Sequence, residues 1–233
     1  MYRICLIRHG KTQGNLLGRY IGVTDECLCQ EGREQIQGGV YPLAKLVFAS
    51  PLRRCMETAG LIYPGIAVQT EELLRECDFG AFENKNYEEL SADSRYQAWV
   101  DSGGSLPFPQ GESHESFCAR CREGFRRVLH MGLVRKERAC HLAEEREVFA
   151  YAKQGTLGEP GSREAVDLAL VVHGGTIMSI LEAFGEPRES FYHWQVKNGE
   201  GFTALLDEEA LEKRDEVRLY EIHPISPFIG LSA

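Results

Sequence analysis

Three short apolar runs constrain the fold of this chain more than any other feature of its sequence. They occupy residues 4–7, 46–49 and 168–172. Continuous apolar runs of this length are typical of strands that are buried on both faces, as in parallel sheets covered by helices. Amphipathic segments lie between them, so the sequence predicts an α/β fold, a three-layer αβα sandwich around a mostly parallel central sheet.

The rest of the hydrophobic pattern supplies the remaining elements. It predicts strands at residues 3–7, 45–49, 168–172, 201–206 and 217–222, with a further edge strand at 66–69. Helices are predicted at residues 31–38, 53–63, 113–129 and 176–184, and Ser113 fits the N-cap of the third. With 233 residues, the chain is long enough for one large α/β domain, so we expect a single domain of residues 1–233.

The connection at about residues 132–164 is longer than the link between a helix and the next core strand needs to be, and we interpret it as an insertion. Its first part, residues 133–153, is rich in Glu, Arg, Lys and Ala, which favours a longer helix or a hairpin of helices. Its second part, residues 154–163, carries three glycines and a proline and is typical of a loop. We weigh three alternatives for its role equally: a lid over the site, a contact in a homodimer, and a surface loop with no special role.

Composition excludes several classes of partner. A net charge of −9 argues against nucleic acid or an anionic membrane as the main partner. No apolar segment reaches the length needed to span a bilayer. The apolar stretch at the start of the chain runs directly into Arg8 and His9, which does not fit a signal peptide. We therefore expect a cytoplasmic protein.

Eight cysteines leave two interpretations open. Cys118 and Cys121 form a C-x-x-C pair, and Cys27 and Cys29 a C-x-C pair, so a four-thiolate zinc site is one alternative. The stronger one is packing, because residues 118 and 121 share a helical spacing with neighbouring apolar residues. We expect reduced thiols that pack, with no metal and no cofactor.

The loops that follow the three apolar runs carry the chemistry. The first run ends in Arg8-His9-Gly10, the second in residues 50–54 with Arg53, and the third in His173-Gly174. Ligands of open α/β sheets bind outside the carboxyl ends of the strands, where helix N-termini favour anions. Taken singly, each residue has a structural interpretation: a hydrogen-bonded histidine, a surface charge or a turn. Their conjunction at three equivalent positions predicts a phosphate pocket.

Taken together, these segments resemble one protein family. The matching stretches are residues 8–12 with Asn15, residues 50–55 with Thr58 and Ala59, residues 74–76 with 79–80 and Glu83, and residues 172–175. They resemble the histidine phosphatase superfamily, which includes the cofactor-dependent phosphoglycerate mutases, and this implies a phosphoglycerate mutase-like fold. Residues 108–113 resemble the bacterial branch that contains α-ribazole phosphatase.

The resemblance implies a role for each site residue. His9 would be the nucleophile that becomes a phosphohistidine, and Arg8, Arg53 and His173 would form the walls of the phosphate pocket. Glu76 would protonate the leaving oxygen and then activate water. Two arginines and an imidazolium can neutralise the phosphoryl oxygens without a metal. The remaining substrate-binding residues would be Asn15, Gly174, Thr12 and Arg19.

The implied activity is that of a metal-independent phosphatase acting on a small phosphorylated metabolite, with α-ribazole phosphate as one candidate. A phosphoglycerate mutase and a non-catalytic phosphate-binding protein are the alternatives. Lys11 and Gly14 stand where mutases carry Glu and Trp, which favours a phosphatase. Two further departures concern turns. Asn84 ends Phe-Glu-Asn where many members have Trp-Glu-Gly, and Gln110 replaces a Gly common in the α-ribazole branch. Glu83 either orients a pocket arginine or has no special role.

Overall fold

A single six-stranded sheet forms the centre of the computed structural model, which describes residues 1–142, 165–207 and 217–227. The strand order is β3-β2-β4-β1-β5-β6. The pairs β1–β4, β4–β2 and β2–β3 are parallel, and β5 is antiparallel to both β1 and β6. The predicted mostly parallel sheet is confirmed, with β3 at its edge. The strands are β1 (Tyr2–Arg8), β2 (Ala44–Ala49), β3 (Val68–Thr70), β4 (Val166–Val172), β5 (Gly201–Leu206) and β6 (Leu219–Ile225).

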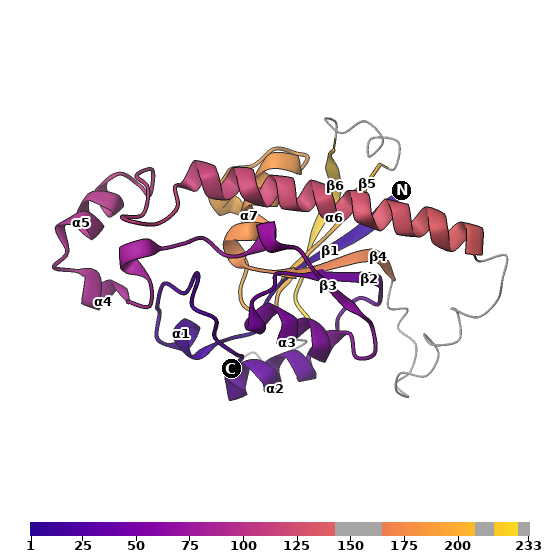
Figure 1. Cartoon of the computed structure of the whole chain (residues 1–233), viewed down its shortest axis with the longest axis horizontal. Coiled ribbons are helices and arrows are strands. Elements are labelled where there is room, and N and C mark those ends of the chain that lie inside the picture. The colour runs from indigo at the N-terminus through magenta and orange to yellow at the C-terminus, as the bar shows by residue number, and fades with distance from the viewer. Residues whose placement is uncertain (143–164, 208–216, 228–233) are drawn as a thin grey trace.

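Helices cover both faces of this sheet (Figure 1). Helices α6 and α7 pack on one face, and α2 and α3 on the other, so the three-layer αβα arrangement is confirmed. The α-helices are α1 (Gln13–Leu16), α2 (Gln30–Gly38), α3 (Arg53–Ile62), α4 (Tyr87–Leu90), α5 (Ser94–Asp101), α6 (His114–Leu142) and α7 (Gly174–Phe184). The 3₁₀ turns are η1 (Glu72–Leu74), η2 (Gly80–Phe82) and η4 (Phe191–Trp194).

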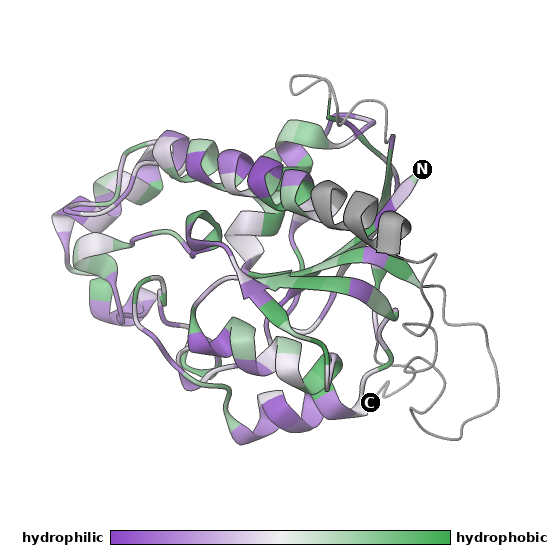
Figure 2. Ribbon diagram, turned by 45° about the vertical axis from the view of Figure 1, so that its right-hand side comes forward, coloured by the Kyte–Doolittle hydropathy of each residue, from purple (hydrophilic) through white to green (hydrophobic). Residues whose placement is uncertain are grey.

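The alternation of side chains along β1 explains why its apolar run is continuous. Ile4 and Leu6 lie in the core beneath α6 and α7, whereas Cys5 and Ile7 lie in the core beneath α2 and α3. All four side chains are fully buried, and burial of an aliphatic side chain contributes about 1.5–3 kcal/mol. Figure 2 shows the same apolar character along the central strands. The sheet is therefore held from both sides, and its strand ends are fixed in position.

Helix α6 differs most from the prediction. It ends at Leu142 rather than at residue 129. The added turns contain one glycine but no proline, and most of their other residues favour a helix, so the helix continues. This agrees with the longer-helix alternative for the start of the predicted insertion, whose residues 143–164 lie outside the described part of the chain. The short helices α4 and α5 were not predicted, because they bury almost no apolar residues.

Most of the cysteines pack inside the protein, as predicted. Cys5, Cys55, Cys77, Cys118 and Cys121 are buried and free. Of the other two described thiols, one is exposed and the other caps α2, where Cys29 Sγ accepts from Gly32 N. Within the described residues, no group of three or more His, Cys, Asp or Glu side chains could hold a metal ion. None of the helices in that same part of the chain is both long and apolar enough to cross a membrane.

Candidate active site

The predicted site residues gather at the carboxyl ends of three adjacent strands. His9 follows β1, Ser50 follows β2 and His173 follows β4. Backbone hydrogen bonds tie these ends together, from His9 N to Val172 O (2.9 Å) and from Ser50 N to Val171 O (3.1 Å). The rings of His9 and His173 meet edge to face, with centroids 5.2 Å apart. The two imidazoles that the sequence predicted together are therefore neighbours.

His9 is held in one tautomer. Its Nδ1 donates to the carbonyl oxygen of Gly10 (2.7 Å), and because a carbonyl can only accept, the proton must sit on Nδ1. Gly10 is itself fixed by a hydrogen bond from its N–H to Thr58 Oγ1 (2.9 Å). Burial, followed by the nearby charges of Arg54 and Arg8, lowers the pKa of His9 well below its usual range. The ring is neutral, and its Nε2 lone pair is available as a nucleophile.

His173, whose ring contacts that of His9, is fully buried. Its Nε2 lies 2.8 Å from Ser50 Oγ, and Cys55 Sγ packs against the same ring at 3.6 Å. Burial lowers the pKa of His173 well below its usual range, and Arg54 and His9 lower it further. At neutral pH the ring is therefore uncharged. This differs from the sequence-based expectation of an imidazolium among the groups that neutralise the phosphoryl oxygens. The positive charge of the site comes from arginines.

Arg8 supplies the first of these charges. Its Nη1 donates to Val196 O (2.7 Å), whereas its Nε is buried with no hydrogen-bond partner in the described part of the chain. The guanidinium lies against the first residue of α7, where a Cβ on Gly174 would come within 3.3 Å of Arg8 Nε. A glycine at this helix start lets the guanidinium approach the backbone closely.

The second arginine is Arg54, which corrects the prediction of Arg53. The Arg53 side chain is 61% exposed and lies 3.9 Å from Glu57. Arg54 is only 1% exposed, and it donates to the carbonyl oxygens of Thr24 (2.8 Å) and Gly22 (2.9 Å). Its Nε is buried and, among the described residues, has no partner. The charge of Arg54 lowers the pKa of both histidines.

Helical geometry explains why Arg54 rather than Arg53 faces the site. Consecutive residues of an α-helix point about 100° apart. Arg54 shares the buried face of α3 with Cys55, Thr58 and Ala59, whereas Arg53 shares the outer face with Glu57. The small residues at positions 55, 58 and 59 are the signal in the sequence that could have identified the inward arginine.

Glu83 fixes the loop that holds Arg54. Its Oε1 accepts from the N–H groups of Gly22 and Thr24, both at 2.9 Å. The carbonyl oxygens of the same two residues accept from Arg54. Of the two alternatives for Glu83, the contacts favour the orientation of a site arginine.

Glu76 lies just after η1 and faces the start of α7. Its Oε1 accepts from Cys77 N (2.9 Å), and a Cβ on Gly175 would lie 2.8 Å from the same oxygen. Burial raises the pKa of Glu76, although the Cys77 N–H group and the charges of Arg54, Arg8 and Arg120 oppose the rise. A carboxyl group with a raised pKa near Arg8 and the buried Arg54 can serve as a proton donor.

The other predicted binding residues lie around the loop after His9. Thr12 and Asn15 cap α1 reciprocally, and Asn198, which the sequence did not single out, donates to both Asn15 Oδ1 (3.1 Å) and His9 O (3.0 Å). These residues therefore shape the loop beside His9. Arg19 lies apart from them, because its guanidinium binds Glu89 and the Asn84 carbonyl oxygen.

A cavity of about 580 Å³ lies away from this cluster. Its lining includes Arg3 and Val166, near the amino ends of β1 and β4. None of the residues around His9 lines it. We therefore place the candidate active site at the carboxyl ends of the strands, on the basis of its chemistry.

Comparison with known proteins finds relatives that align over most of the chain. The sequence model of the histidine phosphatase superfamily (branch 1) matches residues 4–132. The adenosylcobalamin/α-ribazole phosphatase of Escherichia coli is 25% identical over 206 residues, which are 84% of this chain and 86% of the relative. The glucosyl-3-phosphoglycerate phosphatase of Mycolicibacterium vanbaalenii is 29% identical over 208 residues, covering 85% of this chain and 80% of the relative.

Solved structures show the same fold. The crystal structure of the α-ribazole phosphatase from Shigella flexneri aligns with a TM-score of 0.64 at 23% sequence identity. The alignment covers 99% of this chain and 100% of that one. A Thermus thermophilus protein, TTHB049, aligns with a TM-score of 0.54 at 25% identity over 86% of this chain and 92% of that one.

Proposed function

The chain belongs to the histidine phosphatase superfamily, and we propose that it hydrolyses a small phosphomonoester through a phosphohistidine formed on His9. The observation that supports this most is a pair of arginines near His9 whose Nε atoms are buried without a partner in the described part of the chain. The Nε atoms of Arg8 and Arg54 are both buried donors with no partner among the described residues. Buried donors are nearly always satisfied, so two such arginines beside an imidazole fit a bound phosphoryl group.

In the first chemical step, the Nε2 lone pair of His9 attacks phosphorus while the bond from phosphorus to the ester oxygen breaks. The leaving oxygen takes the proton of Glu76, whose raised pKa favours the protonated carboxyl group. Arg8 and Arg54 neutralise the charge on the non-bridging oxygens. The Nδ1–H of His9, donating to Gly10 O, stabilises the positive charge that develops on the ring.

The second step reverses these roles. The Glu76 carboxylate takes a proton from water, the water oxygen bonds to phosphorus, and the bond from phosphorus to His9 Nε2 breaks. Inorganic phosphate leaves, and both His9 and Glu76 return to their starting protonation states. Apart from the ester and one water molecule, every group in these two steps belongs to the chain.

For the substrate, we propose a small phosphorylated metabolite and name α-ribazole phosphate as the first candidate. Support comes from relatives named as phosphatases of α-ribazole and of glucosyl-3-phosphoglycerate, each aligned over more than four fifths of this chain. A screen of phosphorylated metabolites for phosphate release, including α-ribazole phosphate and 3-phosphoglycerate, tests this directly. Conversion of 3-phosphoglycerate to 2-phosphoglycerate without release of phosphate would instead establish a mutase. Absence of turnover on every substrate, activated aryl phosphates included, would support a binding protein.

A further inference from the structure

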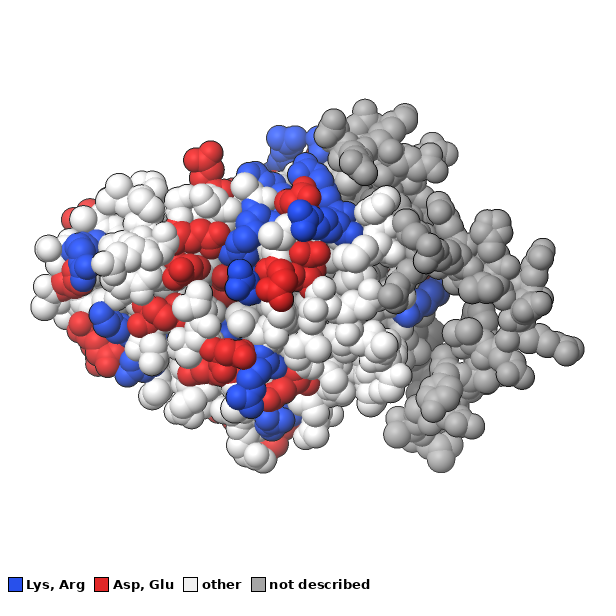
Figure 3. Space-filling model, in the orientation of Figure 1, with Lys and Arg blue, Asp and Glu red and all other residues white. Residues whose placement is uncertain are grey.

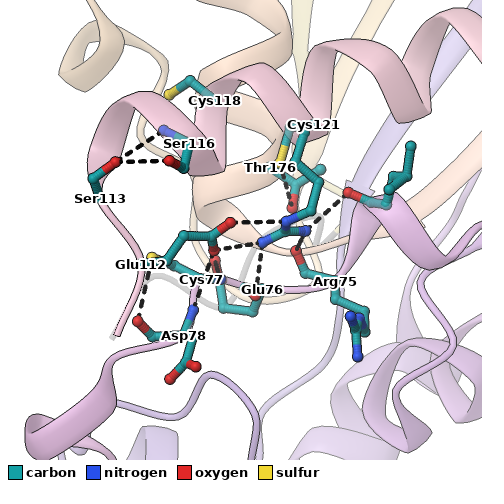
Figure 4. Close-up of polar contacts among 12 residues, drawn as sticks. Arg75, Glu76, Cys77, Asp78, Glu112, Ser113, Ser116, Cys118, Cys121 and Thr176 are labelled. Carbon is teal, nitrogen blue, oxygen red and sulfur yellow. Dashed lines mark hydrogen bonds and ion pairs between the residues drawn. The ribbon is translucent and has the colours of Figure 1, made fainter. Parts of the chain in front are cut away.

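Arg120, on α6, binds the chain segment that carries Glu76. Its Nη1 donates to the carbonyl oxygens of Leu73 and Arg75, both at 2.9 Å, and its Nη2 lies 3.3 Å from Glu76 O. One guanidinium therefore contacts three backbone carbonyls within four residues. Figure 4 shows this segment together with Glu112.

Glu112 holds the other edge of the same guanidinium. Its carboxylate accepts from Arg120 Nε (2.9 Å) and Nη2 (2.7 Å) in a bidentate pair. The side chain of Arg120 is 19% exposed and that of Glu112 is 17% exposed. Pairs of this kind fix direction as well as distance. Glu112 Oε2 also accepts from Asp78 N at 3.4 Å. The pair thus binds the backbone on both sides of Glu76.

The carboxyl group of Glu76 is fixed by different neighbours. Its Oε1 accepts from Cys77 N and lies against the Cα of Gly175. Phe117, which Arg120 covers at 5.3 Å from the ring centroid, packs against Gly175 as well. Arg120 therefore acts on the backbone and the wall around Glu76, while the carboxyl group remains free to meet a leaving oxygen.

We propose that the Arg120–Glu112 pair is a positioning element for proton transfer by Glu76, and that it sets how well the enzyme handles poor leaving groups. The inference rests on the proposed function, in which Glu76 is the general acid. A misplacement of about 1 Å can slow a reaction about 100-fold. An ester whose leaving group needs no proton is insensitive to that misplacement.

The test compares two substrates in conservative variants. Arg120→Lys keeps the positive charge but loses the planar fork, and Glu112→Gln keeps an acceptor but loses the charge. For each variant, kcat/KM is measured with 2,4-dinitrophenyl phosphate and with an alkyl phosphate. The ratio of the two values does not depend on the fraction of correctly folded protein, so a loss of stability cannot imitate the effect.

We expect both variants to raise this ratio by about 10- to 100-fold, because only the alkyl ester needs the proton. Glu76→Gln sets the upper limit, with a rise of about 10²- to 10⁴-fold.

The matched control is Arg127→Lys, because Arg127 pairs with Glu123 on the same helix but both side chains are more than half exposed. Figure 3 shows basic and acidic side chains intermixed on this face of the protein. The control should leave the ratio unchanged.

Two results would overturn the inference in distinguishable ways. If Glu76→Gln raises the ratio and both Arg120→Lys and Glu112→Gln leave it at the wild-type value, the pair is purely structural. If Glu76→Gln itself leaves the ratio unchanged, Glu76 is not the acid, and the proposed mechanism fails together with the inference.

Discussion

Two adjacent arginines at the start of α3 have opposite environments. Arg54 is buried against the loop of residues 21–24, whereas Arg53 lies on the surface beside Glu57. A cation that stabilises a phosphoryl group must point at the site and be shielded from water, since charge interactions weaken in high dielectric. Only Arg54 meets both conditions. The chemistry therefore depends on which of the two arginine side chains faces the site. Arg53 and Arg54 provide a matched pair of positions for testing this assignment.

Arg54→Ala should lower kcat/KM for phosphate esters by about 10²- to 10³-fold, because it removes a preorganised cation from the transition state. Arg53→Ala should remain within about threefold of the wild type, since exposed ion pairs contribute about 0–1 kcal/mol. Steady-state release of phosphate from an aryl phosphate measures both. Equal losses in the two variants would mean that the site arginine has been misassigned.

The pH dependence follows from two groups whose pKa values are shifted in opposite directions. His9 must be neutral to attack, and burial lowers its pKa, so activity falls only when the pH drops below that lowered value. Glu76 must be protonated, and burial raises its pKa, so activity is lost as the pH rises through that raised value. The profile of kcat/KM for an alkyl phosphate should be bell-shaped between the two. Glu76→Gln should abolish the alkaline limb, and persistence of that limb would exclude Glu76 as its source.

Two residues have a backbone conformation that glycine adopts readily, although neither of them is a glycine. Asn84 has a φ of 55° and Gln110 a φ of 62°, both in the left-handed region where residues with a Cβ are disfavoured. At both positions the family resemblance led us to expect a glycine. Asn84 therefore adopts the left-handed conformation that glycine favours, and asparagine tolerates this conformation better than most other residues.

Gln110→Gly should raise the free energy of unfolding by about 1 kcal/mol, because it removes the penalty for a Cβ in the left-handed region. Chemical denaturation followed by circular dichroism measures this change. Gln97→Gly, in the exposed helix α5, is the control and should lower stability by about 1 kcal/mol. If Gln110→Gly destabilises the protein as much as the control does, the turn does not have the conformation described.

The start of α7 leaves no room for a side chain at position 175. A Cβ there would lie 2.8 Å from Glu76 Oε1 and 3.0 Å from Phe117. Gly175→Ala should displace the Glu76 carboxyl group and lower kcat/KM for alkyl phosphates by about 10- to 100-fold. In α3, a Cβ on Gly60 would meet nothing within 4 Å, so Gly60→Ala should leave activity unchanged. Wild-type turnover by Gly175→Ala would show that Glu76 is not confined by α7.

At the scale of the whole molecule, the sequence predicts the sheet better than it predicts the site. Buried strands leave continuous apolar runs, so β1, β2 and β4 could be located, and the histidines after β1 and β4 followed from them. The burial of Arg54 depends on the rotation of α3 about its axis. The Arg120–Glu112 pair depends on contacts between segments that are distant in the sequence. Single-sequence patterns carry little of that information. The resemblance to a known family pointed to Glu76 as the proton donor, which composition alone would not single out among the 35 acidic residues of the chain.

The most direct test of the central proposal is to trap the phosphorylated enzyme. Protein denatured rapidly during turnover of a ³²P-labelled phosphomonoester should carry label that survives alkali, is lost in acid, and maps to the peptide containing His9. His9→Ala should carry none and should not turn over. Label that is stable in acid, or undiminished label on His9→Ala, would contradict nucleophilic attack by His9.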